Sequence, residues 1–510
     1  MTVSIAAVLA LALSTQAAAT QPTATPPAGK DATADAHKGD VVDRSAPPKP
    51  GAPRPFTIQQ PQDFKLKNGL RVLFLPRKRA PLVDVMAAVD AGINADPKEL
   101  PGVAGWTAGM LTEGAGDMDS IAFSDAQNAI GAQIGSGAEP EHATVSLHVS
   151  SAKLADGMKL FAAALTKPRF DDKEWQRVAQ QTFGYFMYQS NEPQELLGIA
   201  GARMNWGVDN RFGVNLSGTP RALAKTTTAD LKAFYGARYR PDTTTLVVVG
   251  DVDKAALQKI LDDTLGAWTA TGKAPDAPKL GAPLPLTSRT VVAVNVAGAP
   301  QTVLSVQNPA PAEIKPYTPD VSVMNTLLGG SFTSRLNSNL REEHGYSYGA
   351  TSHLVLFKNG NAFMVRTSVA TPVTGAAVKE IIKELTRIRE PATAEEVERA
   401  RNLAALSVPS AFDNGRSTAG LWATIAAQGT DPKRLQHFME DAPKVDVKGV
   451  QAVAQRVVDA DKCTIVAVGD MDAIGKDLDA FGPRTLLTID DLLPGLKEAA
   501  AQFAQQPGGE

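Results

Sequence analysis

Hydrophobic positions along the chain follow two patterns, one typical of strands and one typical of helices. Apolar residues spaced three and four apart predict amphipathic helices at 153–166 and 374–390. Alternating or continuous apolar runs rich in β-branched residues predict strands at 70–76, 83–92, 143–151 and 290–297. Because strands and helices cluster in this order, the sequence predicts an α+β fold, with a largely antiparallel sheet packed against helices.

The chain contains an internal repeat with a spacing of about 220 residues. Residues 228–253 and 447–472 each read as an amphipathic helix, a short turn and a buried strand ending in Val-Gly-Asp-x-Asp. Residues 170–177 and 392–399 form a second matching pair, in which a helix begins with acidic residues in its first turn. This spacing is far too long for a solenoid, so we expect two homologous domains.

Composition shifts along the chain suggest where these domains begin and end. The stretch between the two copies is rich in Pro, Ala and Gly, which is typical of a linker. A similar composition near the N-terminus cannot bury enough apolar surface to order itself. The predicted organisation is a signal peptide at 1–19, a disordered Pro/Ala-rich linker at 20–55, an N-terminal domain at 56–268, an inter-domain linker at 269–288, a C-terminal domain at 289–490 and a C-terminal tail at 491–510.

The first residues resemble a secretory signal peptide. A short apolar run from Ile5 to Leu13 is followed by small residues that end at Ala19, where we expect cleavage. No Lys or Arg precedes the run, which departs from the usual pattern. An uncleaved anchor is the alternative, but the run is too short to span a bilayer. The prediction is therefore a periplasmic or secreted protein without stable membrane insertion.

Charge and cysteine content narrow the possible classes of binding partner and exclude a disulfide-stabilised protein. The 51 Lys and Arg nearly balance the 54 Asp and Glu, so nothing favours a nucleic acid or an anionic membrane as partner. The only cysteine, Cys463, lies in an apolar run, so an intrachain disulfide is impossible. We expect Cys463 to act as a small buried hydrophobic residue.

The segment 331–350 carries the most specific chemistry. Leu336 and Leu340 lie one helical turn apart, Arg341 falls in the last turn, and Gly345 is a natural helix-ending residue. Tyr348 then begins an extended segment, so Arg341 and Tyr348 flank a tight helix-to-strand corner. There, a guanidinium and a phenol could both donate to one carbonyl or carboxylate. The alternative is an Arg that caps helix carbonyls and a half-buried Tyr.

The string GGSFTSRLNSNLREEHGYSYGA, residues 329–350, closely resembles the signature of the second domain in the insulinase/pitrilysin family of zinc peptidases. In that family, the matching Arg and Tyr bind the substrate backbone opposite the zinc. The resemblance thus implies that Arg341 and Tyr348 bind a peptide substrate. The matching positions are Ser334, Arg335, Leu336, Leu340, Arg341, Glu342, Gly345 and Tyr348.

The resemblance also locates the family's inverted zinc motif, His-x-x-Glu-His, within residues 101–114. Gly105 and Gly109 stand at the two His positions, and Ala108 stands at the general-base Glu. Aligning the start of a later helix puts Gly184 and Tyr185 where the third ligand, a Glu, belongs. Glycine and alanine side chains offer zinc no donor atom. We therefore expect the 102–114 helix to persist as a scaffold, with no catalytic residue and no metal ligand in this chain.

The histidines do not suggest a replacement metal site. None of the six forms a His-x-x-x-His pair, and none is near residues 102–114 in the sequence. His142 and His148 share one face of a predicted strand but are separated by roughly 20 Å of extended chain. Each is interpreted as a satisfied surface or core residue. The six are His37, His142, His148, His344, His353 and His437.

These observations leave two hypotheses from different classes. In the first, the chain is the non-zinc, pseudo-peptidase subunit of a heterodimer or heterotetramer. It would hold the peptide substrate through Arg341 and Tyr348, while a zinc-bearing homologous subunit supplies the cofactor and the general base. In the second, it is a non-catalytic peptide-binding or structural scaffold protein, although retention of the Arg/Tyr pair argues against a purely structural role. Activity as a lone zinc peptidase fits least, because no ligands remain.

Overall fold

The computed structural model describes residues 56–276 and 280–505. The predicted signal peptide and the segment 20–55 lie outside the described residues. Residues Ile58–Glu510 group into one compact unit, and the elements below belong to it.

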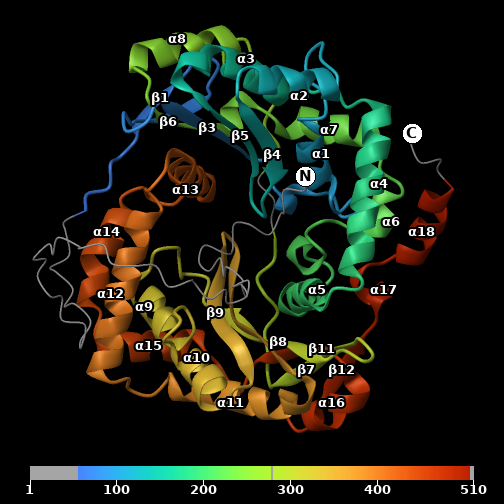
Figure 1. Cartoon of the computed structure of the whole chain (residues 1–510), viewed down its shortest axis with the longest axis vertical. Coiled ribbons are helices and arrows are strands. Elements are labelled where there is room, and N and C mark those ends of the chain that lie inside the picture. Colours follow the sequence, from blue (N-terminus) through green and yellow to red (C-terminus); the bar gives the residue numbers. More distant parts are fainter. Residues whose placement is uncertain (1–55, 277–279, 506–510) are drawn as a thin grey trace, which may run out of the picture. The chain divides into compact units, whose positions relative to one another are not determined.

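The first sheet of this unit has six strands in the order β1-β2-β6-β3-β5-β4 (Figure 1). All neighbouring pairs are antiparallel except β2 and β6, which run parallel. Strand β5 alternates between buried and partly exposed residues, which is the pattern of a sheet with one face in the core. The strands are β1 (Gln62–Lys65), β2 (Arg71–Pro76), β3 (Leu82–Val89), β4 (Gln133–Ala138), β5 (Ala143–Ser150) and β6 (Thr244–Gly250).

Helices pack on this first sheet and on one another. Helix α1 contacts β4 and β5, and α3 contacts β5. Their bounds are α1 (Val103–Met110), α2 (Ser120–Ala129), α3 (Leu154–Thr166), α4 (Asp172–Gln189), α5 (Pro193–Trp206), α6 (Pro220–Leu223), α7 (Thr228–Arg238) and α8 (Lys254–Leu265), with short 3₁₀ turns at η1 (Ile93–Ala95), η2 (Ser151–Lys153), η3 (Arg211–Gly213) and η4 (Pro241–Thr243).

The second sheet also has six strands, in the order β12-β7-β11-β8-β10-β9. Strand β9 is an edge strand and pairs with β10 in a long antiparallel hairpin. Strand β7 is parallel to both β11 and β12. The strands are β7 (Thr290–Asn295), β8 (Gln301–Ala310), β9 (Ser347–Phe357), β10 (Gly360–Ala370), β11 (Thr464–Gly469) and β12 (Arg484–Leu487).

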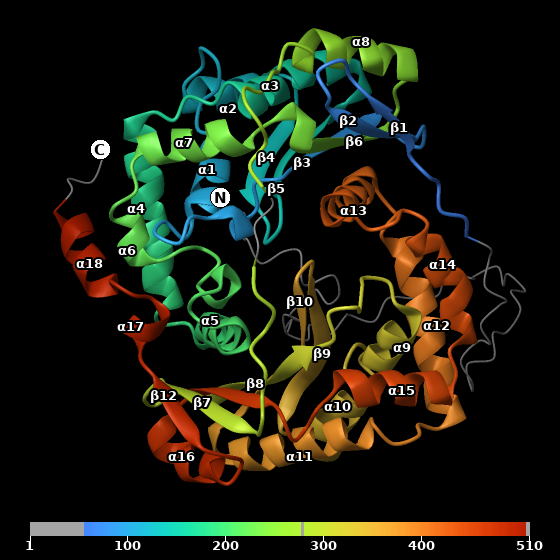
Figure 2. The ribbon, with the colours of Figure 1, turned by 180° about the vertical axis from the view of Figure 1, so that it is seen from behind.

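Helices α11, α15 and α16 run along one side of the second sheet, as Figure 2 shows from behind. Helix α5 contacts β8 and β11 of the same sheet. The bounds are α9 (Pro319–Leu328), α10 (Arg335–Asn337), η5 (Ser338–Glu343), η6 (Thr371–Val373), α11 (Thr374–Arg387), α12 (Ala394–Ser410), α13 (Gly415–Gln428), α14 (Arg434–Asp441), η7 (Ala442–Lys444), α15 (Val447–Val457), α16 (Met471–Asp479), α17 (Ile489–Leu492) and α18 (Leu496–Ala504).

The two sheets confirm the α+β class and the internal repeat. The repeated strands are β6 and β11, which end at Gly250 and Gly469. Each lies inside its sheet, parallel to one neighbour and antiparallel to the other. The strands and helices predicted from hydrophobic periodicity are present, with bounds that differ by a few residues.

One segment carries more structure than its sequence suggested. Residues 491–510 were expected only as a tail, but α18 packs on α4 and α6. The ring of Phe503 stacks on that of Phe183, with ring centroids 4.9 Å apart. This burial of an aromatic ring accounts for the order of a nine-residue helix that periodicity alone left undefined.

Cys463 is buried, as predicted, and burial raises the pKa of its thiol to about 11. Within residues 56–276 and 280–505, no helix combines the length and the hydropathy that crossing a membrane requires.

Candidate functional site

The predicted helix-to-strand corner has an unusual helical turn. The short helix α10 continues directly into the π-helix η5, where the His344 amide donates to the Asn339 carbonyl at 3.1 Å, five residues back. Leu336 and Leu340 are both fully buried, which anchors this turn to the core. The sequence predicted a regular last turn, and the structure replaces it with a wider one. Single π turns occur frequently at functional sites.

Gly345 ends the helical segment, as predicted. Its φ of +65° is left-handed, a conformation that glycine adopts without the penalty paid by other residues. The amide of Tyr346 then donates to the carbonyl of Leu340 at 2.8 Å, and β9 begins at Ser347. The corner is therefore closed by its own backbone.

Tyr348 lies in a β-bulge at the start of β9. Ser347 pairs with Val369 and Ala350 pairs with Thr367, so β9 holds one more residue than β10 across this stretch. The hydroxyls of Ser347 and Thr367 are 2.7 Å apart and hold the bulge in place. Bulges commonly re-aim a side chain next to a functional site.

Both predicted substrate-binding side chains are accessible at this corner. Tyr348 is 92% exposed, and its hydroxyl has no hydrogen-bond partner among the described residues. The guanidinium of Arg341 lies 4.3 Å from the ring centroid of Phe332 and pairs with Glu342 at 3.3 Å. The guanidinium of Arg341 makes no bond to a helix carbonyl of the described residues. The arrangement therefore differs from the structural alternative of a capping Arg and a half-buried Tyr.

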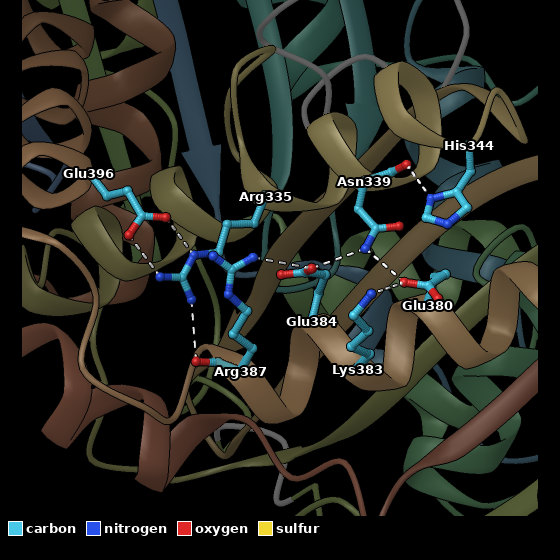
Figure 3. Close-up of polar contacts among 8 residues, drawn as sticks. All are labelled: Arg335, Asn339, His344, Glu380, Lys383, Glu384, Arg387 and Glu396. Atoms are coloured by element: carbon cyan, nitrogen blue, oxygen red, sulfur yellow. Dashed lines mark hydrogen bonds and ion pairs between the residues drawn. The ribbon is translucent and has the colours of Figure 1, made fainter.

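A buried ion pair lies beneath the corner (Figure 3). Arg335 donates to both carboxylate oxygens of Glu396, at 2.8 and 2.9 Å, and also to the carbonyl of Arg387 at 3.2 Å. Glu396 in turn accepts from the amide of Thr393, so one carboxylate joins the start of α12 to α10. The hydrogen bond from Arg335 is the main reason that the pKa of Glu396 falls to about 2.

Asn339 joins the π-helix to α11. Its side-chain amide donates to Glu380 at 2.9 Å and to Glu384 at 3.0 Å, as Figure 3 shows. Lys383 also pairs with Glu380 at 2.7 Å, and these two hydrogen bonds lower the pKa of that carboxyl. The imidazole of His344 lies 3.0 Å from the Asn339 carbonyl. Arg341 therefore stands on a turn whose opposite side is tied to α11.

A cavity of about 180 Å³ adjoins these contacts and is lined in part by Asn339, Glu384 and Arg335. One oxygen of Glu384 and the side-chain oxygen of Asn339 are buried there without a partner in the described residues. The cavity itself is polar and large enough to hold ordered water. Sequence reasoning gave Asn339, Glu384 and Glu396 no role, and it quoted Arg335 only as part of the motif.

The segment in which the sequence analysis located the family's zinc motif, residues 101–114, contains helix α1. Its start is held by Asp96, which accepts from the amides of Gly102 and Ala104 at 2.6 and 2.7 Å. Asp96 also pairs with the buried Arg211 at 2.7 Å. Burial raises the pKa of Asp96, against the opposing effect of Arg211 and the two amides. The predicted scaffold helix is therefore present, although it ends at Met110 rather than near 114.

Gly105 and Gly109 are the only residues of α1 that are not buried, and they lie one turn apart. A Cβ added at either position would meet nothing within 4 Å. Gly184 on α4 is equally open, and α4 contacts α1. Ala108, at the expected general-base position, is fully buried.

These residues do not fit a zinc ion, because none of the three glycines has a donor atom. The part of the chain that the structure describes also contains no group of three or more His, Cys, Asp or Glu side chains suited to a metal. His148 instead pairs with Asp84 at 2.7 Å, and burial lowers the pKa of His142 to about 4.

The fold and the site together define an α+β protein of two six-stranded sheets, in which the open face of α1 presents Gly105 and Gly109. Two models of one family match the chain, "Insulinase (Peptidase family M16)" at residues 71–199 and "Peptidase M16 inactive domain" at residues 225–404. Together they cover more than half of the sequence. The chain belongs to the insulinase family of peptidases.

Two bacterial proteins described as uncharacterized zinc proteases are similar to this chain. An uncharacterized zinc protease of Mycobacterium tuberculosis is 23% identical over 410 residues, covering 79% of this chain and 92% of that protein. One of Bacillus subtilis is 20% identical over 290 residues, covering 57% of this chain and 69% of its own length.

Two solved structures share the fold. The peptidase M16 inactive domain from Pseudomonas fluorescens has a TM-score of 0.74 and 24% identity, covering 81% of this chain and 98% of that chain. A protease from Helicobacter pylori has a TM-score of 0.74 and 18% identity, covering 81% and 100%.

Proposed function

We propose that this protein is the non-zinc subunit of a heteromeric insulinase-family metallopeptidase. It binds a peptide substrate through Arg341 and Tyr348, and a homologous partner subunit supplies the zinc and the general base. The pair assembles as a heterodimer or heterotetramer in the periplasm or outside the cell, after cleavage of the signal peptide. This chain itself carries no cofactor.

The accessibility of Tyr348 is the observation that carries the proposal. A phenol that is 92% exposed gains little from burial, yet its backbone is fixed by the bulge and the Ser347 hydroxyl. The π turn beside it is tied to α11 through Asn339. Such rigid support of an exposed, unpartnered donor is expected of a binding residue, because preorganisation reduces the entropy lost on binding.

The chemistry required of this corner is positioning. A guanidinium has five donors and a phenol has one, so both can donate to a peptide carbonyl or carboxylate. Holding a flexible peptide in a reactive geometry lowers the barrier to its cleavage without any metal in this subunit. The open glycine face of α1 supports a division of labour in which another chain carries the catalytic groups.

Substitution of the two binding residues tests this proposal. Arg341→Ala should lower kcat/KM of the assembled pair by roughly ten- to a hundredfold, because one charge-assisted hydrogen bond contributes about 1.5–3 kcal/mol. Tyr348→Phe should lower it by about tenfold, and both variants should still assemble. Arg456→Ala, at an exposed arginine on α15, and Tyr346→Phe, at the same corner, serve as controls. Wild-type kinetics in both test variants would refute the binding role.

Affinity purification tests the partnership. The tagged chain is purified from the periplasm of its own organism, and the eluate is assayed on an unstructured peptide with and without a chelator. We expect chelator-sensitive cleavage and a co-eluting homologue that carries His-x-x-Glu-His. If the chain elutes alone and inactive, the proposal fails in favour of a peptide-binding or structural scaffold protein.

A further inference from the structure

Arg366, in the middle of β10, has no partner for its charge within the described part of the chain. Its Nε atom is buried without a hydrogen-bond acceptor, and its guanidinium forms no hydrogen bond or ion pair with any residue in 56–276 or 280–505. Its terminal nitrogens are not among the buried unpartnered atoms, so solvent still reaches them. Burial lowers the pKa of Arg366, which agrees with a guanidinium that is partly removed from water.

The buried arginines Arg211 and Arg335, in contrast, have partners for their charge and their donors. Arg211 pairs with Asp96 and donates to three backbone carbonyls, and Arg335 pairs with Glu396 and donates to a fourth. A guanidinium remains charged in proteins, so removing it from water without a partner costs free energy that the fold must supply. Arg366 therefore has the unpaired charge that is expected of an anion-binding site.

The acidic group whose charge acts on Arg366 does not fill this need. Glu195 on α5 acts on Arg366 through its charge but forms no ion pair with it within 4.0 Å. One of its oxygens already accepts from the Tyr185 hydroxyl at 3.1 Å and from the Gln189 amide at 3.0 Å. Glu195 is thus held in a separate network.

The other neighbours offer the guanidinium no anion. Gly198 on α5 has no side chain, and the guanidinium lies close against it, because a Cβ there would lie only 3.3 Å from a terminal nitrogen of Arg366. Burial and the charge of Arg366 lower the pKa of His353 on β9 to about 4, so its imidazole is neutral near pH 7 and supplies no anion.

Arg366 lies close to the proposed peptide-binding corner. It pairs in register with Thr351 on the edge strand β9, and Thr351 is exposed. Tyr348 precedes Thr351 by three residues on the same strand, which corresponds to about 10 Å of extended chain. A peptide lying along β9 from the corner would reach Arg366 after about three residues.

We propose that Arg366 binds a carboxylate of the peptide held at Arg341 and Tyr348, so that the subunit prefers substrates with an anionic group about three residues from the corner. The inference rests on the proposed function and adds a substrate class to it. The carboxylate comes from the peptide C-terminus or from an Asp or Glu side chain. Either can accept two parallel hydrogen bonds from one guanidinium, a geometry that an ammonium does not match.

Four labelled peptides distinguish these sources. Each is the same ten-residue Gly/Ala/Ser sequence with fluorescein at its N-terminus, carrying an internal Glu or Gln and a C-terminal carboxylate or amide. Binding to the full chain is measured by fluorescence anisotropy. We expect at least one carboxylate-bearing peptide to bind on the order of tenfold more tightly than the Gln amide peptide. The peptide that binds more tightly shows whether Arg366 binds the C-terminal carboxylate or the Glu side chain.

Arg366→Gln should remove this advantage and leave binding of the Gln amide peptide unchanged. Arg366→Lys should keep part of it, and Arg456→Gln should keep all of it. If the wild-type chain binds all four peptides equally, the inference is wrong and the proposed function stands. If it binds none, both fail. Arg341→Ala should instead weaken all four peptides alike.

Thermal unfolding checks the premise. Since Arg366 has no partner among the residues that the structure describes, Arg366→Gln should keep or raise the melting temperature. A fall of several degrees would mean that the guanidinium is paired within the protein, and the inference would be abandoned.

Discussion

Asp96 and Glu396 each pair with a buried arginine. Each carboxylate also accepts hydrogen bonds from the backbone at the start of a helix, Asp96 from two amides and Glu396 from one. Their pKa values nevertheless move in opposite directions. The side chain of Asp96 is 0% exposed, and burial raises its pKa. The side chain of Glu396 is 17% exposed, and the bond from Arg335 lowers its pKa to about 2. The depth of the pair, more than its geometry, decides whether ionisation is favoured.

The two ion pairs support segments that differ in the side chains they present. Asp96 holds the start of α1, whose open face now carries only glycines. Glu396 holds Arg335, directly before the turn that carries Arg341. The support of α1 lies beside an open face without donor side chains, whereas the support of the π turn lies beside the accessible side chains of Arg341 and Tyr348. In this fold, the polar support of a helical segment therefore does not depend on the side chains that its open face carries.

Of the substitutions that test this comparison, Asp96→Asn should cause the largest change in the free energy of unfolding. The substitution leaves Arg211 buried without its counter-charge, which typically costs about 3–5 kcal/mol of unfolding free energy. Urea denaturation at pH 7 measures the loss. Asp209→Asn, at an exposed aspartate that pairs with Lys98, should leave the midpoint unchanged. If the two variants behave alike, the support of α1 does not depend on the buried pair.

Glu396→Gln should change the response to acid. The folded-state pKa of about 2 lies below the ordinary value of 4.5, so this carboxylate stabilises the fold above pH 4.5. The contribution, discounted for solvent screening to on the order of 2 kcal/mol, is lost as the pH falls from about 4.5 to 2. Unfolding curves of Glu396→Gln should be less stable at pH 7 and flatter across this window. Glu395→Gln, at the exposed neighbour, should retain the wild-type slope.

Combined Gly105→Ala and Gly109→Ala should have the smallest effect, with the opposite sign. Both positions are helical and face open space, so alanine meets no obstacle and lowers the entropy of the unfolded chain. The expected gain is about 1 kcal/mol for the pair. Thermal unfolding measures it, with Gly102→Ala as the contrasting control, because φ at Gly102 is +111° and its Cβ would approach Trp106. Destabilisation by the double variant would show that the open face is filled in solution.

Hydrophobic periodicity predicted the strands and helices that build both sheets, because long amphipathic and β-branched runs have few alternative ways to bury their apolar positions. The repeat at Gly250 and Gly469 predicted the duplication, and Gly345 predicted the end of the corner helix. These features depend on residues close together in the sequence, and a single chain reveals them directly.

Long-range polar partners could not be predicted in the same way. Arg335 and Glu396 are separated by 61 residues, and Asp96 and Arg211 by 115, so no local spacing joins them. The π turn depends on a hydrogen bond one residue longer than that of an α-helix, which the pattern of side chains does not specify. The isolation of Arg366 is visible only once its neighbours on α5 and β9 are known.

The packing of Phe503 against Phe183 constrains the order in which the protein can fold. Phe503 lies far along the sequence from Phe183, yet it belongs to the hydrophobic core shared with α1 and the first sheet. The N-terminal half therefore cannot complete its core until α18 has been synthesised, although its own strands are synthesised first. A chain truncated before α18 would expose the Phe183 face of α4, and would report whether the first sheet is stable without its last helix.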